Sequence, residues 1–265
     1  MEPRNIILAL AITLFAGLAT GIGSAIAFVA HRMSRSAISF ALGLSAGVML
    51  YISFVELFVE AQEVLCEAYG GQVGNIAATI SLFAGIALIW LIDLLVPDYE
   101  NPHELHKVSP NKVGISSHKR IGVMTALAIA IHNFPEGIST FITAIESPSL
   151  GLAIGVAIAL HNIPEGIAVS VPIYQATGSR KKAFWYSFLS GLSEPLGAII
   201  AYLFLAPYLN GTLMGVILAA VAGVMIYVAI DELLPSSRSY GKHNAAMCGV
   251  VIGMVIMAAT LLFMG

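Results

Sequence analysis

The sequence predicts an all-α integral membrane protein with eight transmembrane helices. The chain is 58% hydrophobic and only 10% charged, whereas an average soluble domain is about 25% charged. Apolar runs of roughly 20 residues, each long enough to cross about 30 Å of hydrocarbon, recur along its whole length. These runs are continuous rather than alternating at every second residue, which favours helices over membrane-spanning strands.

The first apolar run is interpreted as a membrane helix rather than as a secretory signal. It is too long for the apolar part of such a signal, and its leader MEPRN carries no net positive charge. Seven further runs follow it. The eight predicted spans are, in chain order, residues 6–30, 37–59, 76–96, 121–144, 151–174, 183–206, 213–234 and 245–264.

The longest connection, residues 97–120, is polar and rich in charge, Pro and Ser, which predicts a cytoplasmic loop. It joins three helices to five within a single transmembrane transporter domain, residues 1–265. Histidine is a common zinc ligand, so the histidines of this loop either hold metal transiently or are ordinary solvated residues. They are His103, His106 and His118.

The distribution of basic residues predicts the orientation. With both termini placed outside the cytosol, the inner segments hold 11 of the 12 Lys and Arg residues, and only Arg4 lies outside. This bias follows the positive-inside rule and supports an even number of spans. We therefore expect a multi-pass protein of the cell inner membrane with both termini outside the cytosol. Cys66 and Cys248 fall on opposite sides of the bilayer, so no disulfide is expected.

Two pairs of segments predict an internal repeat. AGVMLYISFVEL at 46–57 recurs as AGVMIYVAIDEL at 222–233, an offset of 176, and GLATGIGSAIA at 17–27 resembles GLSEPLGAIIA at 191–201, an offset of 174. Each copy lies five spans after the first, so the two copies cross the membrane in opposite directions. We expect an inverted repeat of helices 1–3 and 6–8 around helices 4–5, with a pathway between the halves. The alternative is chance similarity between helices rich in Ala and Gly.

The middle two helices carry a paired polar motif, HNFPEGIS at 132–139 and HNIPEGIA at 161–168. In each copy, the His and Glu are four residues apart and share one helix face. Ionisable groups in hydrocarbon cost several kcal/mol unless they are paired, hydrated or bound to a cation. Imidazole nitrogen with amide and carboxylate oxygen suits Zn²⁺, Fe²⁺, Mn²⁺ or Co²⁺ better than Cu⁺. The candidate ligands are His132, Asn133, Glu136, His161, Asn162 and Glu165.

Each motif also contains a proline, Pro135 or Pro164, which leaves the carbonyl four residues earlier without its helical partner. We expect a kink there, with freed carbonyls facing a hydrated cation. The sixth span repeats the pairing of carboxylate and proline at Glu194–Pro195, so Glu194 joins the candidate ligands. The alternative interpretation is a set of hydrogen-bonded contacts between helices and simple kinks.

Acidic residues flank this site along the chain. Four of them share one helical stripe at the outer end of the second span, where they either concentrate cations at an entrance or form a solvated helix end. They are Glu56, Glu60, Glu63 and Glu67. By the repeat, Glu56 corresponds to Glu232, and Asp231 and Glu232 lie toward the inner end of the seventh span. We expect Asp231 and Glu232 to line an exit path.

The motifs HNFPEG and HNIPEG and the segment SEPLGA resemble those of the ZIP (zinc- and iron-regulated-transporter-like) family of metal importers, specifically its bacterial zinc-uptake branch. The span layout, the long loop and the repeat extend the resemblance over essentially the whole chain. The resemblance implies dimers and a site for two metals, with Glu136 and Glu165 bridging the ions. It implies five further ligands, which are His132, Asn133, His161, Asn162 and Glu194. Some relatives have an acidic residue in place of Asn162, so occupancy of the second metal position stays open.

We therefore expect a transporter, not an enzyme, that imports divalent transition-metal cations (Zn²⁺, with Fe²⁺, Mn²⁺ and Co²⁺) into the cytosol. The metal is the substrate and no cofactor is expected; the partners are metal ions, the lipid bilayer and no nucleic acid. The ATP-binding pattern GxxxxGK[ST] is absent from the sequence. Two alternatives remain: an intramembrane metal-dependent hydrolase, which lacks the usual HExxH, and a proton- or sodium-coupled exchanger of another substrate.

Overall fold

The computed structural model describes residues 3–29, 34–95, 115–205, 208 and 210–264, and all regular structure in these ranges is helical. Within these ranges, seven runs of helix are long and apolar enough to span a membrane, which confirms the prediction of an all-α membrane protein. The elements are α1 (Pro3–Val29), α2 (Arg35–Ile52), η1 (Ser53–Leu57), α3 (Phe58–Tyr69), α4 (Gly71–Leu95), α5 (Ile115–Glu146), α6 (Pro148–Thr177), α7 (Arg180–Gly191), α8 (Ser193–Ile200), η2 (Ala201–Leu205), α9 (Gly211–Val228), η4 (Ala229–Leu233), α10 (Leu234–Ser239) and α11 (His243–Met264).

The predicted fourth span, residues 121–144, lies within α5, which is not one of those seven runs. A count of eight spans therefore stays a prediction. The helix α5 already begins at Ile115, within the predicted loop 97–120, and its first residues are mostly polar, so the cytoplasmic position of this connection stays a prediction. A helix can continue into water beyond the bilayer, where polar side chains are solvated. The side chains of the three loop histidines lie outside the described part of the chain.

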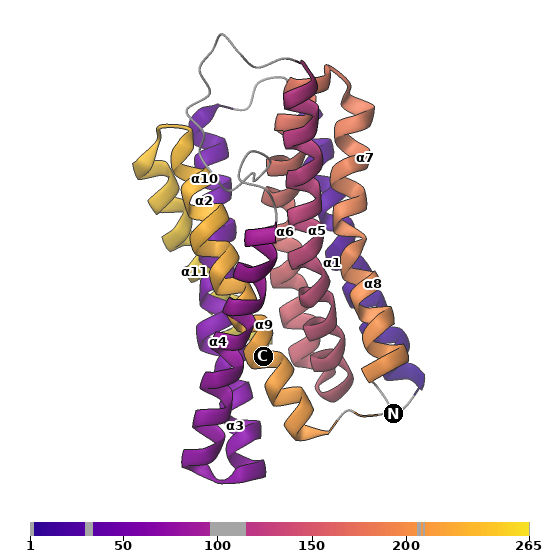
Figure 1. Ribbon diagram of the computed structural model, residues 1–265, viewed down its shortest axis with the longest axis vertical. Coiled ribbons are helices and arrows are strands. Elements are labelled where there is room, and N and C mark those ends of the chain that lie inside the picture. The colour runs from indigo at the N-terminus through magenta and orange to yellow at the C-terminus, as the bar shows by residue number, and fades with distance from the viewer. Residues whose placement is uncertain (1–2, 30–33, 96–114, 206–207, 209, 265) are drawn as a thin grey trace.

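The helices form two groups that lie side by side (Figure 1). One group contains α1, α5, α6, α7 and α8, on the right of that view. The other contains α2, α3, α4, α9, α10 and α11, with α2 packed on α11 and α4 packed on α9. The groups meet mainly where α6 packs against α2 and α11 and where α5 packs against α9.

Glycines let helix backbones cross closely within the first group. A Cβ atom at Gly137 of α5 would collide with the carbonyl oxygen of Glu194 on α8. A Cβ at Gly166 of α6 would likewise collide with the carbonyl oxygen of Thr20 on α1. Small residues at such positions are typical of membrane helices that pack backbone to backbone. The two glycines, Gly137 and Gly166, are 29 residues apart, as the two polar motifs are. Their partners, Thr20 and Glu194, are 174 residues apart, which is the offset between the repeated segments 17–27 and 191–201.

A second pair of crossings has the same relation. Gly197 of α8 lies against the carbonyl oxygen of Phe134, and Gly23 of α1 lies against that of Ile163. These positions are again separated by 174 and by 29. The α5–α8 and α6–α1 contacts therefore use equivalent positions.

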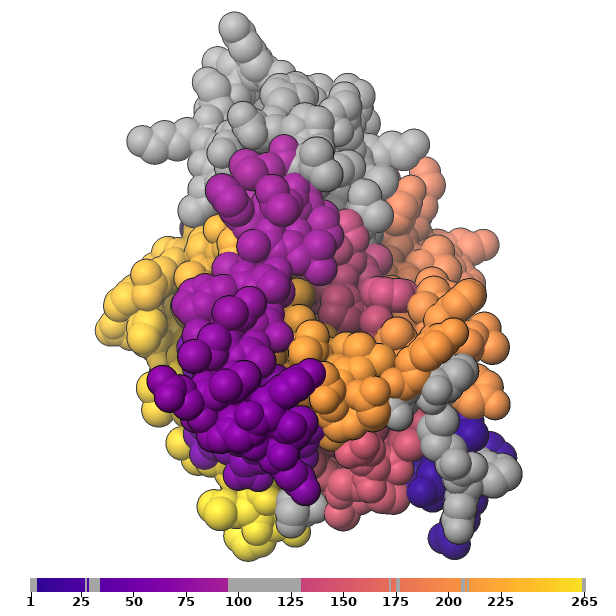
Figure 2. Space-filling view, turned by 60° about the horizontal axis from the view of Figure 1, so that its bottom comes forward, coloured from indigo at the N-terminus to yellow at the C-terminus, as the bar shows by residue number. Residues whose placement is uncertain are grey.

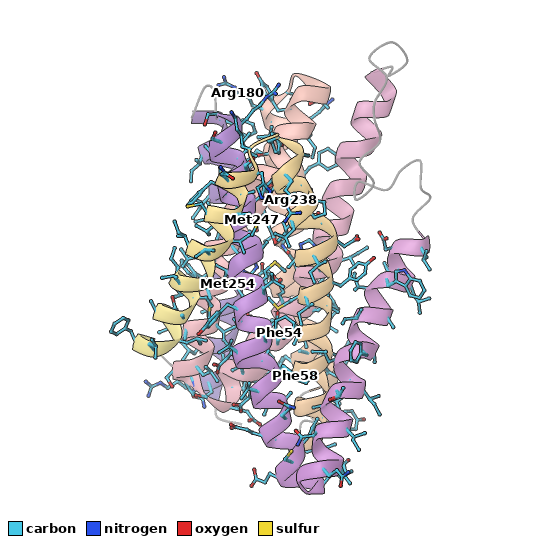
Figure 3. All side chains as sticks on the ribbon, turned by 90° about the vertical axis from the view of Figure 1, so that its left-hand side faces the viewer. Phe54, Phe58, Arg180, Arg238, Met247 and Met254 are labelled. Atoms are coloured by element: carbon cyan, nitrogen blue, oxygen red, sulfur yellow. The ribbon has the colours of Figure 1, made fainter. Side chains whose placement is uncertain are left out.

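Two π-helical turns interrupt the second group. η1 follows α2 and η4 follows α9, and their first and last residues are separated by 176 positions. In each turn the residue after the last, Phe58 or Leu234, donates its N–H to the carbonyl of the first. Figure 3 shows Phe54 of η1 in the lower half of the molecule and Arg238, just after η4, in the upper half. Such turns are frequent at functional sites.

A groove of about 710 Å³ separates parts of the two groups. Its walls come from α4, α5, α8 and α9 and are almost entirely apolar, with Leu88, Ile138, Leu196 and Ile217 among them. Two of these helices, α4 in purple and the start of α9 in orange, lie side by side on the face shown in Figure 2. The groups are therefore not closely packed along their full length.

Candidate metal site

The structure buries all of the predicted ligands in the interior of the protein. Each has at most 2% of its surface exposed. They come from three helices that pack on one another, α5, α6 and α8. Pro135 and Pro164 lie inside α5 and α6, whereas the sixth span is broken at Leu192, shortly before Pro195. The buried residues are His132, Asn133, Glu136, His161, Asn162, Glu165 and Glu194.

The histidine of each motif faces the glutamate of the other motif. Nε2 of His161 lies 3.2 Å from Oε2 of Glu136, within hydrogen-bonding distance. Nε2 of His132 lies 3.6 Å from Oε1 of Glu165. The two contacts are related in the same way as the two motifs, and both tie α5 to α6. The spacing of four therefore aligns each His and Glu on one face, but each finds its partner across the helix interface.

Asn162 of α6 forms hydrogen bonds with both α1 and α8. Its side-chain Nδ2 donates a hydrogen bond to the carbonyl of Ala16 on α1, at 2.9 Å, and another to Oε1 of Glu194. An amide nitrogen carries two hydrogens, so both are used. Asn162 thereby fixes the carboxylate of Glu194 beside the paired motifs.

Several ligand-type atoms of the site have no hydrogen-bond partner among the described residues. They are Oε1 of Glu136, Nδ1 of His161, Oδ1 of Asn162 and Oε2 of Glu194. Buried polar atoms without a partner cost about 1–3 kcal/mol each, so such a group needs an explanation. Glu194 also lies close enough to Glu136 and Glu165 for their charges to repel. A divalent cation satisfies both requirements at once.

In the present arrangement, no three His, Cys, Asp or Glu side chains of the described residues are grouped closely enough to share one ion. The His–Glu contacts hold the site's nitrogen and oxygen atoms against each other instead.

Of the flanking acidic residues, the structure places Glu232 at the site. Its Oε2 lies 3.7 Å from Nδ1 of His132, and the residue is 7% exposed. Asp231 lies beside Tyr227 instead. Glu56 and Glu60 are half-buried in η1 and α3, and neither forms an ion pair or hydrogen bond with a motif residue within the described ranges. Glu60 and Glu63 are close enough to Glu56 to repel its charge.

Several supporting groups were not predicted. The carbonyl of Ala16 accepts from Asn162, the hydroxyl of Ser45 donates to the carbonyl of His161 at 3.3 Å, and Ser187 donates to that of Gly166 at 3.2 Å. An alanine carbonyl leaves no signal in a sequence. The two serines could not be predicted either, because serine is common in membrane helices, where it forms hydrogen bonds with nearby carbonyls.

Comparison with known proteins gives consistent matches. Residues 96–261 match the family model described as "ZIP Zinc transporter". The "Zinc transporter ZupT" of Clostridium perfringens (strain 13 / Type A) is 52% identical over 275 residues, which cover 98% of this chain and 96% of that protein. The proteins of the same name from Oceanobacillus iheyensis and Streptococcus mutans serotype c are 53% and 51% identical, each over 98% of this chain and 99% and 98% of their own. The similarity thus extends along the whole chain.

Proposed function

Because this chain belongs to the ZIP zinc transporter family, we propose that it carries Zn²⁺ across the membrane through the buried site of α5, α6 and α8. Proteins of this family are membrane transporters rather than enzymes, so the hydrolase alternative is wrong. The relatives are named as zinc transporters. Zinc accepts nitrogen and oxygen ligands, and Fe²⁺, Mn²⁺ and Co²⁺ accept the same set. These three are further proposed substrates.

The observation that supports this proposal most directly is the set of unsatisfied buried ligand atoms. Four atoms without partners come from Glu136, His161, Asn162 and Glu194, and all four residues are fully buried. They are nitrogen and oxygen atoms. We infer that zinc replaces the His–Glu contacts, with Glu136 and Glu165 bridging when two ions are present. The remaining ligands are His132, Asn133, His161, Asn162 and Glu194.

We further propose import into the cytosol with both termini outside. The basic start of α7 and Arg238 lie in the upper part of Figure 3, and the acidic η1–α3 segment lies in the lower part. The positive-inside rule assigns the upper end to the cytosol. Zinc then enters past Glu56 and Glu60 and leaves past Glu232 and Asp231. The inverted repeat, the dimer and the single domain remain predictions; the paired glycine crossings and π-helical turns support the repeat.

The central test is uptake of radiolabelled zinc into proteoliposomes. We expect Glu136→Ala and Glu165→Ala to reduce uptake to background while the proteins remain monodisperse in detergent. Glu67→Ala is the matched control, because Glu67 is exposed at the end of α3, and it retains most of the uptake. Uptake at the parent rate by either motif variant would show that the site lies elsewhere.

A second measurement separates a zinc carrier from an exchanger of another substrate. Ligand binding to the folded state stabilises it, by about 2.7 kcal/mol at a concentration of one hundred times Kd. We expect zinc to raise the unfolding temperature of the purified parent protein, and to raise it much less in Glu136→Ala. An exchanger whose carboxylates bind only protons or Na⁺ shows no zinc-dependent shift in either protein.

A further inference from the structure

His132 and His161 occupy equivalent positions in the paired motifs, yet the Nδ1 atoms of the two rings have different surroundings. Each histidine directs Nε2 to the glutamate of the other motif. Nδ1 of His132 then faces Glu232, 3.7 Å away. Nδ1 of His161 is buried and has no hydrogen-bond partner among the described residues. The surroundings of the two rings therefore differ on one side only.

The partner that His161 lacks can be identified from equivalent positions. Glu232 is the fourth residue of η4, and the fourth residue of η1, 176 positions earlier, is Glu56. The glycine crossings relate α5 to α6 by 29 positions and α1 to α8 by 174 positions, and the second shift is close to the 176 positions between η1 and η4. If the repeat makes His132 equivalent to His161, it therefore also makes Glu232 equivalent to Glu56. Glu56 is half-buried and forms no ion pair with either motif in this structure.

We propose that Glu56 is a positioning residue, which accepts a hydrogen bond from Nδ1 of His161 in a second conformation where Glu232 has released His132. This inference rests on the proposed transport function and adds a residue to it. A histidine that binds metal through one nitrogen commonly donates its other N–H to a carboxylate, which fixes the ring and its tautomer. Glu232 and Glu56 provide that carboxylate alternately, from opposite halves of the membrane.

The two groups of helices explain why only one contact exists at a time. His132 and His161 belong to the group of α1 and α5 to α8, whereas Glu56 and Glu232 both belong to the group of α2 and α9. Phe54 of η1 lies in the lower half of Figure 3, and Arg238 of α10, the helix that follows η4, lies in the upper half. A shift of one group along the other brings His161 toward η1 and takes His132 away from η4. The conformation described here has the η4 contact.

Cross-linking by Hg²⁺ between paired cysteines tests this directly. In a background where Cys66 and Cys248 are Ser, Glu56→Cys is combined with His161→Cys, and loss of maleimide-reactive thiols is followed with time. The matched control combines Glu63→Cys with His161→Cys, because Glu63 lies on the same stripe farther from η1. We expect Hg²⁺ to cross-link the pair at positions 56 and 161 at least about tenfold faster than the control pair at positions 63 and 161. Equal rates for the two pairs would overturn the proposal.

Transport kinetics supply a readout that does not use cysteine variants. Loss of a hydrogen bond to a charged group is equivalent to about a tenfold change in an equilibrium or a rate. We expect Glu56→Gln to lower the maximal rate of zinc uptake about tenfold, and Glu56→Asp to recover part of that rate. Equal maximal rates for Glu56→Gln and the parent would contradict the assignment. The parent protein is assayed alongside; absence of zinc uptake by the parent would refute the transport proposal itself, while the cross-linking rates still report on Glu56.

Discussion

Asn162 organises the carboxylates of the site. Its amide nitrogen donates to Ala16 and to Glu194, so its oxygen is the atom left for a cation. A carboxylate at this position has no hydrogen to donate and adds a negative charge beside Glu194. The amide therefore lowers the charge of the site and fixes its geometry in the absence of metal.

The change Asn162→Asp should make the thermal stability of the protein depend more strongly on bound zinc. Without metal, two hydrogen bonds are lost and two carboxylates adjoin in a buried position, each unsatisfied group costing about 1–3 kcal/mol. We expect a lower unfolding temperature without zinc and a larger zinc-induced increase than in the parent. Asn75→Asp on the exposed face of α4 is the control. The same increase in the parent and in Asn162→Asp would exclude a role for the amide in setting the charge of the site.

Zinc binding should weaken as the pH falls from about 6.5 toward 5, the range between the ordinary pKa values of His and Glu. The ligands must be deprotonated to bind metal, so protons compete with zinc and are released when it binds. Calorimetric titrations in buffers of different ionisation enthalpy count these protons. Glu194→Gln should release fewer protons than the parent; equal release would exclude Glu194 as a titrating ligand.

The candidate ligands could be predicted from residue type and spacing, because a carboxylate and a histidine four residues apart must share a helix face. Their partners could not be predicted. Whether His161 meets Glu136 or Glu165 depends on how α5 and α6 are rotated against each other, and spacing along one helix does not contain that angle. Glu232 was expected along an exit path, but its contact with His132 depends in the same way on helix packing.

Close backbone crossings determine how near the helices α1, α5, α6 and α8 lie to one another. The carbonyl oxygens of Glu194 and Thr20 occupy the space that a Cβ at Gly137 or Gly166 would need. These glycines directly follow Glu136 and Glu165, so the position of each motif carboxylate depends on its neighbouring crossing. The sequence does not indicate which helix approaches each glycine or that π-helical turns follow α2 and α9.

Gly137→Ala should therefore destabilise the protein strongly, although it adds only one methyl group. The added methyl group forces the α5 and α8 backbones apart, and overpacking of this kind costs about 1–3 kcal/mol. We expect a lower thermal unfolding temperature and weaker zinc binding. Gly71→Ala is the control, because no atom lies within 4 Å of a Cβ at that position. Equal stability of the two variants would contradict the close crossing.

Over the whole molecule, the basic and the acidic helix ends lie at opposite ends, and the orientation across the membrane that they favour stays a prediction. Arg180 and Arg238 lie toward one end, and the acidic helix α3 lies at the other (Figure 3). The long apolar runs could be predicted because each must cross the hydrocarbon. The division into two groups could not, because apolarity alone does not say which helices pack together.

A labelling experiment tests the orientation. In a background without Cys66 and Cys248, a cysteine at Gly71 should react with an impermeant maleimide added outside intact cells, and one at Lys181 should react only after the cells are opened. Both positions are exposed at helix starts. The opposite labelling pattern would reverse the proposed topology and the direction of import.

The apolar groove between α4, α5, α8 and α9 has a consequence for how the protein responds to pressure. A closely packed contact transmits strain and resists deformation, whereas helices beside an open apolar groove of about 710 Å³ have room to move against each other. Such a shift then has a reaction volume and an activation volume. Hydrostatic pressure favours the more compact conformation, so the rate of zinc uptake should vary with pressure even where zinc affinity does not.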